Sequence, residues 1–116
     1  MQAHHYARIA WMRCPTANHA HFLAKAIYSQ AGKPTKQVLE MYAKAIALDP
    51  MNMRFRYEYA VLLFASRKYN QSARQIRRIR WINSHQPVDS PVHLTANEMK
   101  KLDLLESKIK KHLQEL

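Results

Sequence analysis

The chain has 116 residues, of which 47% are hydrophobic and 23% charged, a balance that suits a single soluble domain burying roughly two-thirds of its unfolded surface. Its one glycine excludes phosphate-cradling and dinucleotide-binding loops, which need several glycines close together, and disfavours the many tight turns of all-β folds. With 19 Lys and Arg against 8 Asp and Glu, the net charge is +11, which favours anionic partners without specifying one. Composition therefore predicts an all-α fold with a basic surface.

The sequence contains no stretch long enough to enter a membrane unaided. Its longest uninterrupted apolar run, residues 59–65, falls far short of the roughly 20 residues that span a bilayer. We therefore expect no membrane insertion by this segment. The single cysteine, Cys14, excludes an internal disulfide bond. A cytoplasmic location is expected for a complete chain, and the location is undetermined for a part of a larger protein.

Three prolines mark a repeat along the chain. Pro15, Pro50 and Pro87 follow one another at intervals of 35 and 37 residues, and each comes after a segment with small or apolar residues at helical spacing. Such intervals are typical of repeated helix hairpins. The pattern predicts helices with antiparallel neighbours over residues 3–13, 17–31, 35–47, 52–66, 69–84 and 96–115.

Breakers and caps separate the first four of these helices. Gly32 suits the left-handed residue after a helix end, and Thr35 suits the start of the next helix. Asp49-Pro50 ends the third helix, and Asn52 can cap the fourth. The residues expected on the packed faces of the first three helices are Ala3, Ala7, Ala10, Phe22, Leu23, Ala26, Ile27, Val38, Tyr42, Ala45 and Ile46.

The fourth and fifth helices form a second hairpin, which a proline-rich segment follows. Because Pro87 and Pro91 leave little room for a helix, residues 88–94 are expected to form an extended linker. The residues expected on the packed faces of this hairpin are Phe55, Tyr59, Leu62, Leu63, Ser72, Ile76 and Ile79.

The last helix begins with a capping box, since Thr95 is followed three residues later by Glu98. Its apolar residues form one stripe, which has to pack against something. We expect residues 95–116 to cap the end of a helical array. The alternative is a helix that serves assembly with a partner or with a second copy of the chain. The stripe consists of Met99, Leu102, Leu105, Ile109, Leu113 and Leu116.

The third helix resembles the second helix of a tetratricopeptide repeat, a family of 34-residue helix hairpins. The likeness rests on Tyr42, on Ala45 three positions later, and on the Leu-Asp-Pro ending at residues 48–50 with Asn52 beyond it. The resemblance extends over about residues 3–84. It implies a right-handed αα-superhelix built of helix hairpins.

On this resemblance, residues 1–116 form a single domain of repeats closed by a cap. The chain departs from the family at Arg67, where a helix-ending glycine is usual, and at Ser84, where the closing proline would fall. The family's tryptophan is missing at the start of both first helices. The implied segments are a half repeat over residues 3–15, repeats over 17–50 and 53–86, the linker over 88–94 and the capping helix over 95–116.

The resemblance also implies where a partner would bind, because the first helix of each hairpin lines the concave groove of such arrays. Cations and aromatic residues at the groove positions suit an acidic or aromatic-bearing peptide, through charge-assisted hydrogen bonds and large contact areas. Alternatively, some of these aromatic residues pack against the next repeat or the terminal helix. The expected partner-binding residues are Asn18, His21, Lys25, Tyr28, Arg54, Tyr57, Val61 and Phe64.

The densest group of cations lies in and before the fifth helix. Arg74, Arg77 and Arg78 share one helix face by their spacing, and Trp81 nearby could stack on a base, as in proteins that bind single strands. The simpler interpretation is a solvated basic face. The expected polyanion-binding residues, for the case that this face is functional, are Arg67, Lys68, Arg74, Arg77, Arg78 and Arg80.

No catalytic, metal or cofactor site is recognisable. Cys14, His19 and His21 come closest to a zinc-binding set, but they lack a defined ligand spacing. The acidic residues are too scattered to orient a histidine beside a nucleophile. We therefore expect neither enzyme activity nor a cofactor.

Together these patterns predict a scaffold that binds an acidic peptide or partner protein. Two alternatives stay open. One is a basic adaptor for RNA or another polyanion, and the other is the soluble, non-catalytic part of a larger membrane-associated machine.

Overall fold

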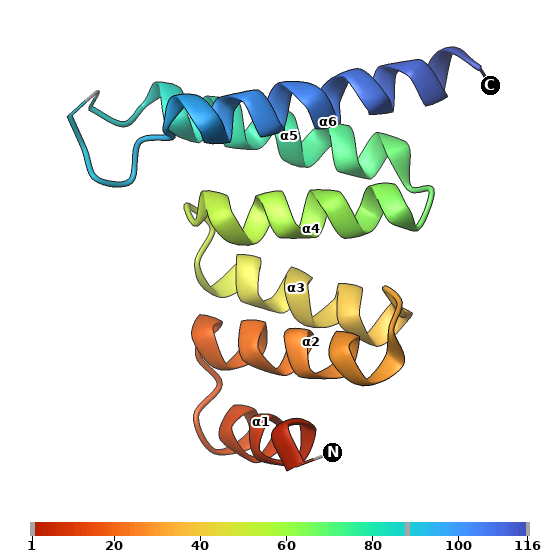
Figure 1. Ribbon diagram of the computed structural model, residues 1–116. Coiled ribbons are helices and arrows are strands. Elements are labelled where there is room, and N and C mark those ends of the chain that lie inside the picture. The colour runs from red at the N-terminus through yellow and green to blue at the C-terminus, as the bar shows by residue number, and fades with distance from the viewer. Residues whose placement is uncertain (1, 88, 116) are drawn as a thin grey trace. The chain divides into compact units, whose positions relative to one another are not determined.

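The computed structural model describes residues 2–87 and 89–115, with side chains from residue 4 onward, and consists of six helices (Figure 1). No strand occurs in these ranges, which confirms the predicted all-α class. The predictions for Val88 and Leu116, and for the side chain of Ala3, lie outside the described residues. The helices are α1 (Gln2–Arg13), α2 (Ala17–Ala31), α3 (Lys36–Leu48), α4 (Met53–Ala65), α5 (Tyr69–Ser84) and α6 (Ala96–Gln114).

The helix starts lie within one residue of the predicted ones, and side chains cap the starts of α2, α3, α4 and α6. The hydroxyls of Thr16, Thr35 and Thr95 each accept a hydrogen bond from a backbone N–H in the first turn of α2, α3 and α6. The Asn52 side chain accepts one from the backbone N–H of Phe55 at 2.9 Å, as predicted. The capping box of α6 is complete, since the Glu98 side chain accepts a hydrogen bond from the backbone N–H of Thr95 at 2.9 Å.

Two helices end on a residue in the left-handed conformation. Gly32 follows α2 with φ of 73°, as the sequence predicts. Arg67 follows α4 with φ of 61°, although it carries a side chain. The backbone N–H of Lys68 bonds to the carbonyl of Leu63 at 2.9 Å, and that of Arg67 bonds to Phe64 at 3.0 Å. This pair of bonds is the Schellman motif, in which Arg67 takes the left-handed position that glycine usually occupies.

The helices divide into two compact units, residues 1–55 and 56–116. In the first unit α2 packs against both α1 and α3. Its core contains several alanines, which let the helix backbones approach closely, together with Leu23, Ile27 and Val38. Across the α1–α2 hairpin, the His4 and Gln30 side chains share a hydrogen bond of 2.6 Å.

The second unit contains most of α4 together with α5 and α6. The Ser72 hydroxyl on α5 donates a hydrogen bond of 2.7 Å to the Ala60 carbonyl on α4, and both residues are completely buried. The apolar stripe of α6 packs against α5, with Leu102, Leu105 and Ile109 buried. That α6 caps the end of a helical array stays a prediction.

The segment between α5 and α6 is turned rather than extended, which corrects the sequence prediction. The backbone N–H of Ser90 donates to the Pro87 carbonyl at 2.9 Å, and that of His93 donates to Ser90 at 3.1 Å. Pro91 is the second residue of the latter turn, where its fixed φ favours the turn over an extended chain. The buried side chain of Asn83 then accepts a hydrogen bond from the Leu94 backbone at 2.8 Å and anchors the segment to α5.

Candidate binding surfaces

The predicted partner-binding residues of the first hairpin share one face of α2. Asn18, His21, Lys25 and Tyr28 recur at spacings of three and four residues, beside the stripe that α2 buries. Asn18 and Lys25 are exposed, and Tyr28 keeps 39% of its surface accessible. This face therefore presents an amide, an ammonium group and a phenol to solvent.

His21 takes a structural place on this face instead of lying open to solvent. Its ring is half-buried and stacks on Phe55, with the ring centroids 4.4 Å apart, and it meets the edge of Tyr42 at 5.5 Å. These contacts fill the space between α2, α3 and the first turn of α4. The spacing of the sequence indicated the face on which His21 lies but not the partners of its ring.

The second predicted set shares one face of α4 by the same spacing. Arg54 and Val61 are exposed, whereas Tyr57 and Phe64 are half-buried. Phe64 contacts the rings of Tyr69, at 5.5 Å, and His112, at 5.3 Å. This contact corresponds to the alternative in which an aromatic residue packs against the terminal helix. That both sets together line one groove stays a prediction.

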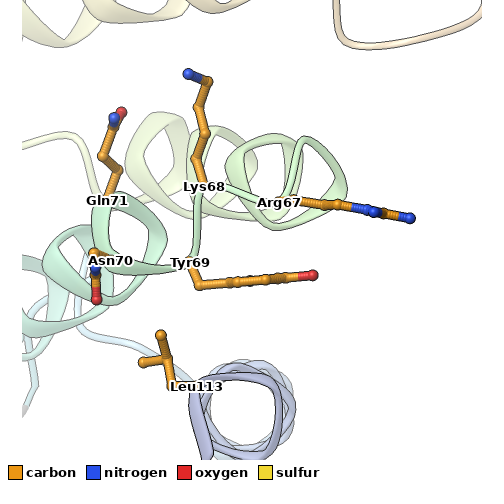
Figure 2. A pocket seen from close by; sticks show the side chains of 6 residues that line it. All are labelled: Arg67, Lys68, Tyr69, Asn70, Gln71 and Leu113. Carbon is orange, nitrogen blue, oxygen red and sulfur yellow. The ribbon is translucent and has the colours of Figure 1, made fainter. Parts of the chain in front are cut away.

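The turn between α4 and α5 forms a shallow hollow of about 230 Å³ (Figure 2). The side chains of Lys68 and Gln71 project to the same side, away from Leu113 on α6 (Figure 2). Tyr69 is stacked on the ring of His112 on α6, at 4.9 Å. Arg67 and Lys68, both predicted for polyanion binding, are exposed at this turn. The hollow is lined by Arg67, Lys68, Tyr69, Asn70, Gln71 and Leu113.

The arginines of α5 fall into two groups. Arg74, Arg77 and Arg78 are exposed, as expected. Arg80 instead binds two carboxylates of α6, Asp103 at 2.6 Å and Glu106 at 2.9 Å. The hydrogen bond to Asp103 is the main cause that raises the pKa of Arg80; burial lowers this pKa, and the hydrogen bond to Glu106 and the two carboxylate charges raise it further. Arg80 therefore joins α6 to α5.

Two residues near the basic face of α5, the half-buried Arg56 and the exposed His85, were not predicted from the sequence. Arg56 on α4 donates a hydrogen bond of 2.9 Å to the Gln75 side chain on α5. Burial, and then the positive charge of Arg78, lower the pKa of Arg56. His85 lies one helical turn after Trp81, a spacing that could have identified it as a stacking partner.

The histidines and Cys14 do not form a metal site in the described part of the chain. Within residues 2–87 and 89–115 no three side chains of His, Cys, Asp or Glu converge as metal ligands would. His19 donates its Nδ1 hydrogen to the Cys14 carbonyl at 2.6 Å, which ties the ring to the preceding turn.

None of the described helices combines the length and the apolar character needed to cross a bilayer.

Comparisons of the chain with protein-family models, with curated proteins and with solved structures found no match.

Proposed function

We propose that this protein is a scaffold of tetratricopeptide-type helix hairpins that binds an acidic segment of another protein on the faces of α2 and α4. The observation that carries the proposal is the exposure of Lys25 and Tyr28 on one face of α2, beside the buried stripe of the same helix. An ammonium group beside an aromatic ring attracts carboxylates and offers apolar contact area. The net charge of +11 would speed the encounter with such a partner.

The helix hairpins supply the rigid surface that such binding needs. Each predicted set recurs at three- and four-residue spacing, so its members lie on one side of a helix whose ends are fixed by caps. An extended peptide running along these faces would pass Asn18, Lys25 and Tyr28 in turn. The proposal assigns no catalytic residue, metal or cofactor.

A charge reversal on these faces tests the proposal. The probe is a fluorescent peptide of alternating glutamate and phenylalanine, and its anisotropy reports binding. Replacing Lys25 and Arg54 together by Glu should weaken binding more than about tenfold, because like charges then face the peptide. The control replaces the exposed Lys33 and Lys36 by Glu, which changes the net charge equally away from the two faces.

Circular dichroism must show that both double variants remain helical. Equal loss of affinity in the two would indicate attraction by net charge alone. Unchanged affinity in the Lys25 and Arg54 variant would contradict the assignment of these faces.

A further inference from the structure

The basic charge of α5 is concentrated on the side that faces solvent. This helix of 16 residues carries four arginines and no acidic residue. Arg80 is neutralised by Asp103 and Glu106 of α6. Arg74 and Arg78 are exposed on the side of α5 away from its buried residues.

These two arginines belong to a continuous surface stripe. Residues 71, 74, 78, 81 and 85 recur at alternating spacings of three and four, so they follow one line along the helix for about 21 Å. All five are exposed, whereas Ser72, Ile76, Ile79 and Asn83 face the interior. We call this line the α5 outer stripe, and it consists of Gln71, Arg74, Arg78, Trp81 and His85.

In the C-terminal half of the α5 outer stripe, the planar groups of Arg78, Trp81 and His85 lie against one another, and we call these three groups the tier. The guanidinium carbon of Arg78 lies 4.6 Å from the centroid of the Trp81 ring, and the His85 ring centroid lies 4.1 Å from it. The Nδ1 hydrogen of His85 donates to the Trp81 carbonyl at 2.7 Å, which fixes the orientation of the imidazole. Trp81 nevertheless keeps 45% of its surface accessible. The indole therefore retains exposed surface against which a further flat group can stack.

Folding also brings further positive charge to this side of α5. Arg56 on α4 is held against Gln75 and interacts with Arg78, and this repulsion contributes to the lowered pKa of Arg56. An anion bound beside Arg78 would be attracted by both guanidinium groups. The surface is therefore prepared for a negatively charged ligand with flat, stackable groups.

We propose that the α5 outer stripe binds single-stranded nucleic acid, with Arg74 and Arg78 on phosphates and a base stacked on the tier around Trp81. Phosphates and unpaired bases together match both features of the stripe, since arginine pairs with phosphate and bases stack on aromatic rings and guanidinium planes. An acidic peptide would match the charge but leave the tier unused. In a duplex the bases are paired and stacked on one another, so only the phosphates would be available to the stripe. This binding goes beyond the proposed protein-binding function and uses a different surface.

Fluorescence on the full chain tests the stacking. Trp11→Phe leaves Trp81 as the single tryptophan, and titration with oligouridine should quench its emission. Trp81→Leu, which keeps an apolar side chain without an aromatic face, should weaken binding of labelled oligouridine about 5- to 100-fold. Trp81→Phe should retain most of the affinity, because it retains a ring. Absence of quenching, or equal affinity in the Leu and Phe variants, would overturn the proposal.

The same assay tests the role of the charges. Replacing Arg74 and Arg78 by Gln should weaken oligouridine binding more than about tenfold and flatten its dependence on salt. The control replaces the exposed Lys100 and Lys111 of α6 by Gln, which removes equal charge from another helix and should change affinity little. Similar losses in both variants would show attraction by net charge and overturn the assignment to α5.

Competing polyanions identify the class of ligand. We expect a single-stranded oligouridine to displace the labelled probe better than a duplex or polyglutamate of equal charge. Equal competition by the duplex would mean that bases do not stack on the tier. Tighter binding of polyglutamate would assign the surface to an acidic protein. Either result refutes the proposal, and circular dichroism of each variant confirms that the helices are intact.

Discussion

Arg67 holds the end of α4 in a conformation that residues with a side chain rarely adopt. Its φ of 61° crowds the Cβ atom against the backbone, and this costs roughly 1–2 kcal/mol relative to glycine. The Schellman hydrogen bonds from residues 67 and 68 fix the conformation nevertheless. The exposed guanidinium group of Arg67 is the feature that a glycine here would lose.

We therefore predict that Arg67→Gly stabilises the protein. The free energy of unfolding should rise by about 1 kcal/mol, because relief of the crowded Cβ exceeds the added flexibility of the unfolded chain. Denaturant unfolding followed by circular dichroism measures the change. Arg67→Ala is the control, since it removes the guanidinium group but keeps the Cβ atom and should give no comparable gain. A destabilised glycine variant would contradict this account.

Ser72 shows how one small polar residue sets the approach of two helices. It is completely buried, and its hydroxyl donates to the Ala60 carbonyl at 2.7 Å. Ser72→Ala should lower the free energy of unfolding by about 1 kcal/mol through the lost hydrogen bond. Ser72→Leu should cost more, roughly 1–3 kcal/mol, because the larger side chain separates α4 from α5.

Ser84 provides the comparison on the same helix. Its hydroxyl also bonds to a carbonyl, that of Trp81 at 2.8 Å, but the residue is exposed. Ser84→Ala should change stability by less than about 0.5 kcal/mol, because water replaces the lost partner. Thermal melts of the three serine variants measure these changes in stability. An equal loss of stability in Ser72→Ala and Ser84→Ala would contradict the structural role of Ser72, because burial would then make no difference to the value of the hydrogen bond.

At the scale of elements, α6 is joined to α5 by apolar burial and by the ion pairs of Arg80. Leu102, Leu105 and Ile109 are buried in the middle of the helix. Arg80 binds Asp103 and Glu106, but these groups are partly exposed, so the ion pairs add little. The apolar stripe therefore provides most of the free energy that holds α6 in place.

Two neighbouring leucines test this account of α6. Leu105 keeps 7% of its surface exposed, and Leu104 keeps 58%. Leu105→Ala should lower the free energy of unfolding by roughly 2–4 kcal/mol, whereas Leu104→Ala should have almost no effect.

Removing residues 95–116 should cause aggregation or early melting, because the apolar side of α5 becomes exposed. A truncated chain that stays soluble and melts normally would refute the capping role.

At the scale of the whole molecule, we predict that the intact chain is a monomer. The buried leucine and isoleucine stripe of α6 is engaged by α5 within the same chain, so it is not available to a second copy. The net charge of +11 also makes two copies repel each other. Sedimentation across a wide range of concentrations should give one species of 13.7 kDa. A dimer would point to assembly through another surface, such as the exposed Tyr6 and Met12 of α1.

The sequence by itself determined the helices and their ends. Periodic apolar residues, and caps such as Thr95 and Asn52, act within a few positions of the chain. The helices that they start and end can therefore be predicted without knowing the fold. The same local rules placed the predicted binding residues on shared helix faces. They failed for the segment after Pro87, where Pro91 supports a turn as readily as an extended chain.

Only the tertiary structure decided which side chains remain available for binding. The stacking of His21 on Phe55, the pairing of Arg80 with α6 and the hydrogen bond from Arg56 to Gln75 all join helices, and no spacing within one helix encodes them. Asn83 likewise anchors the segment before α6 by a bond to Leu94. Such contacts depend on how side chains from separate elements fill a common space, because packing is a property of three-dimensional shape and sequence periodicity gives only the direction in which a side chain leaves its helix.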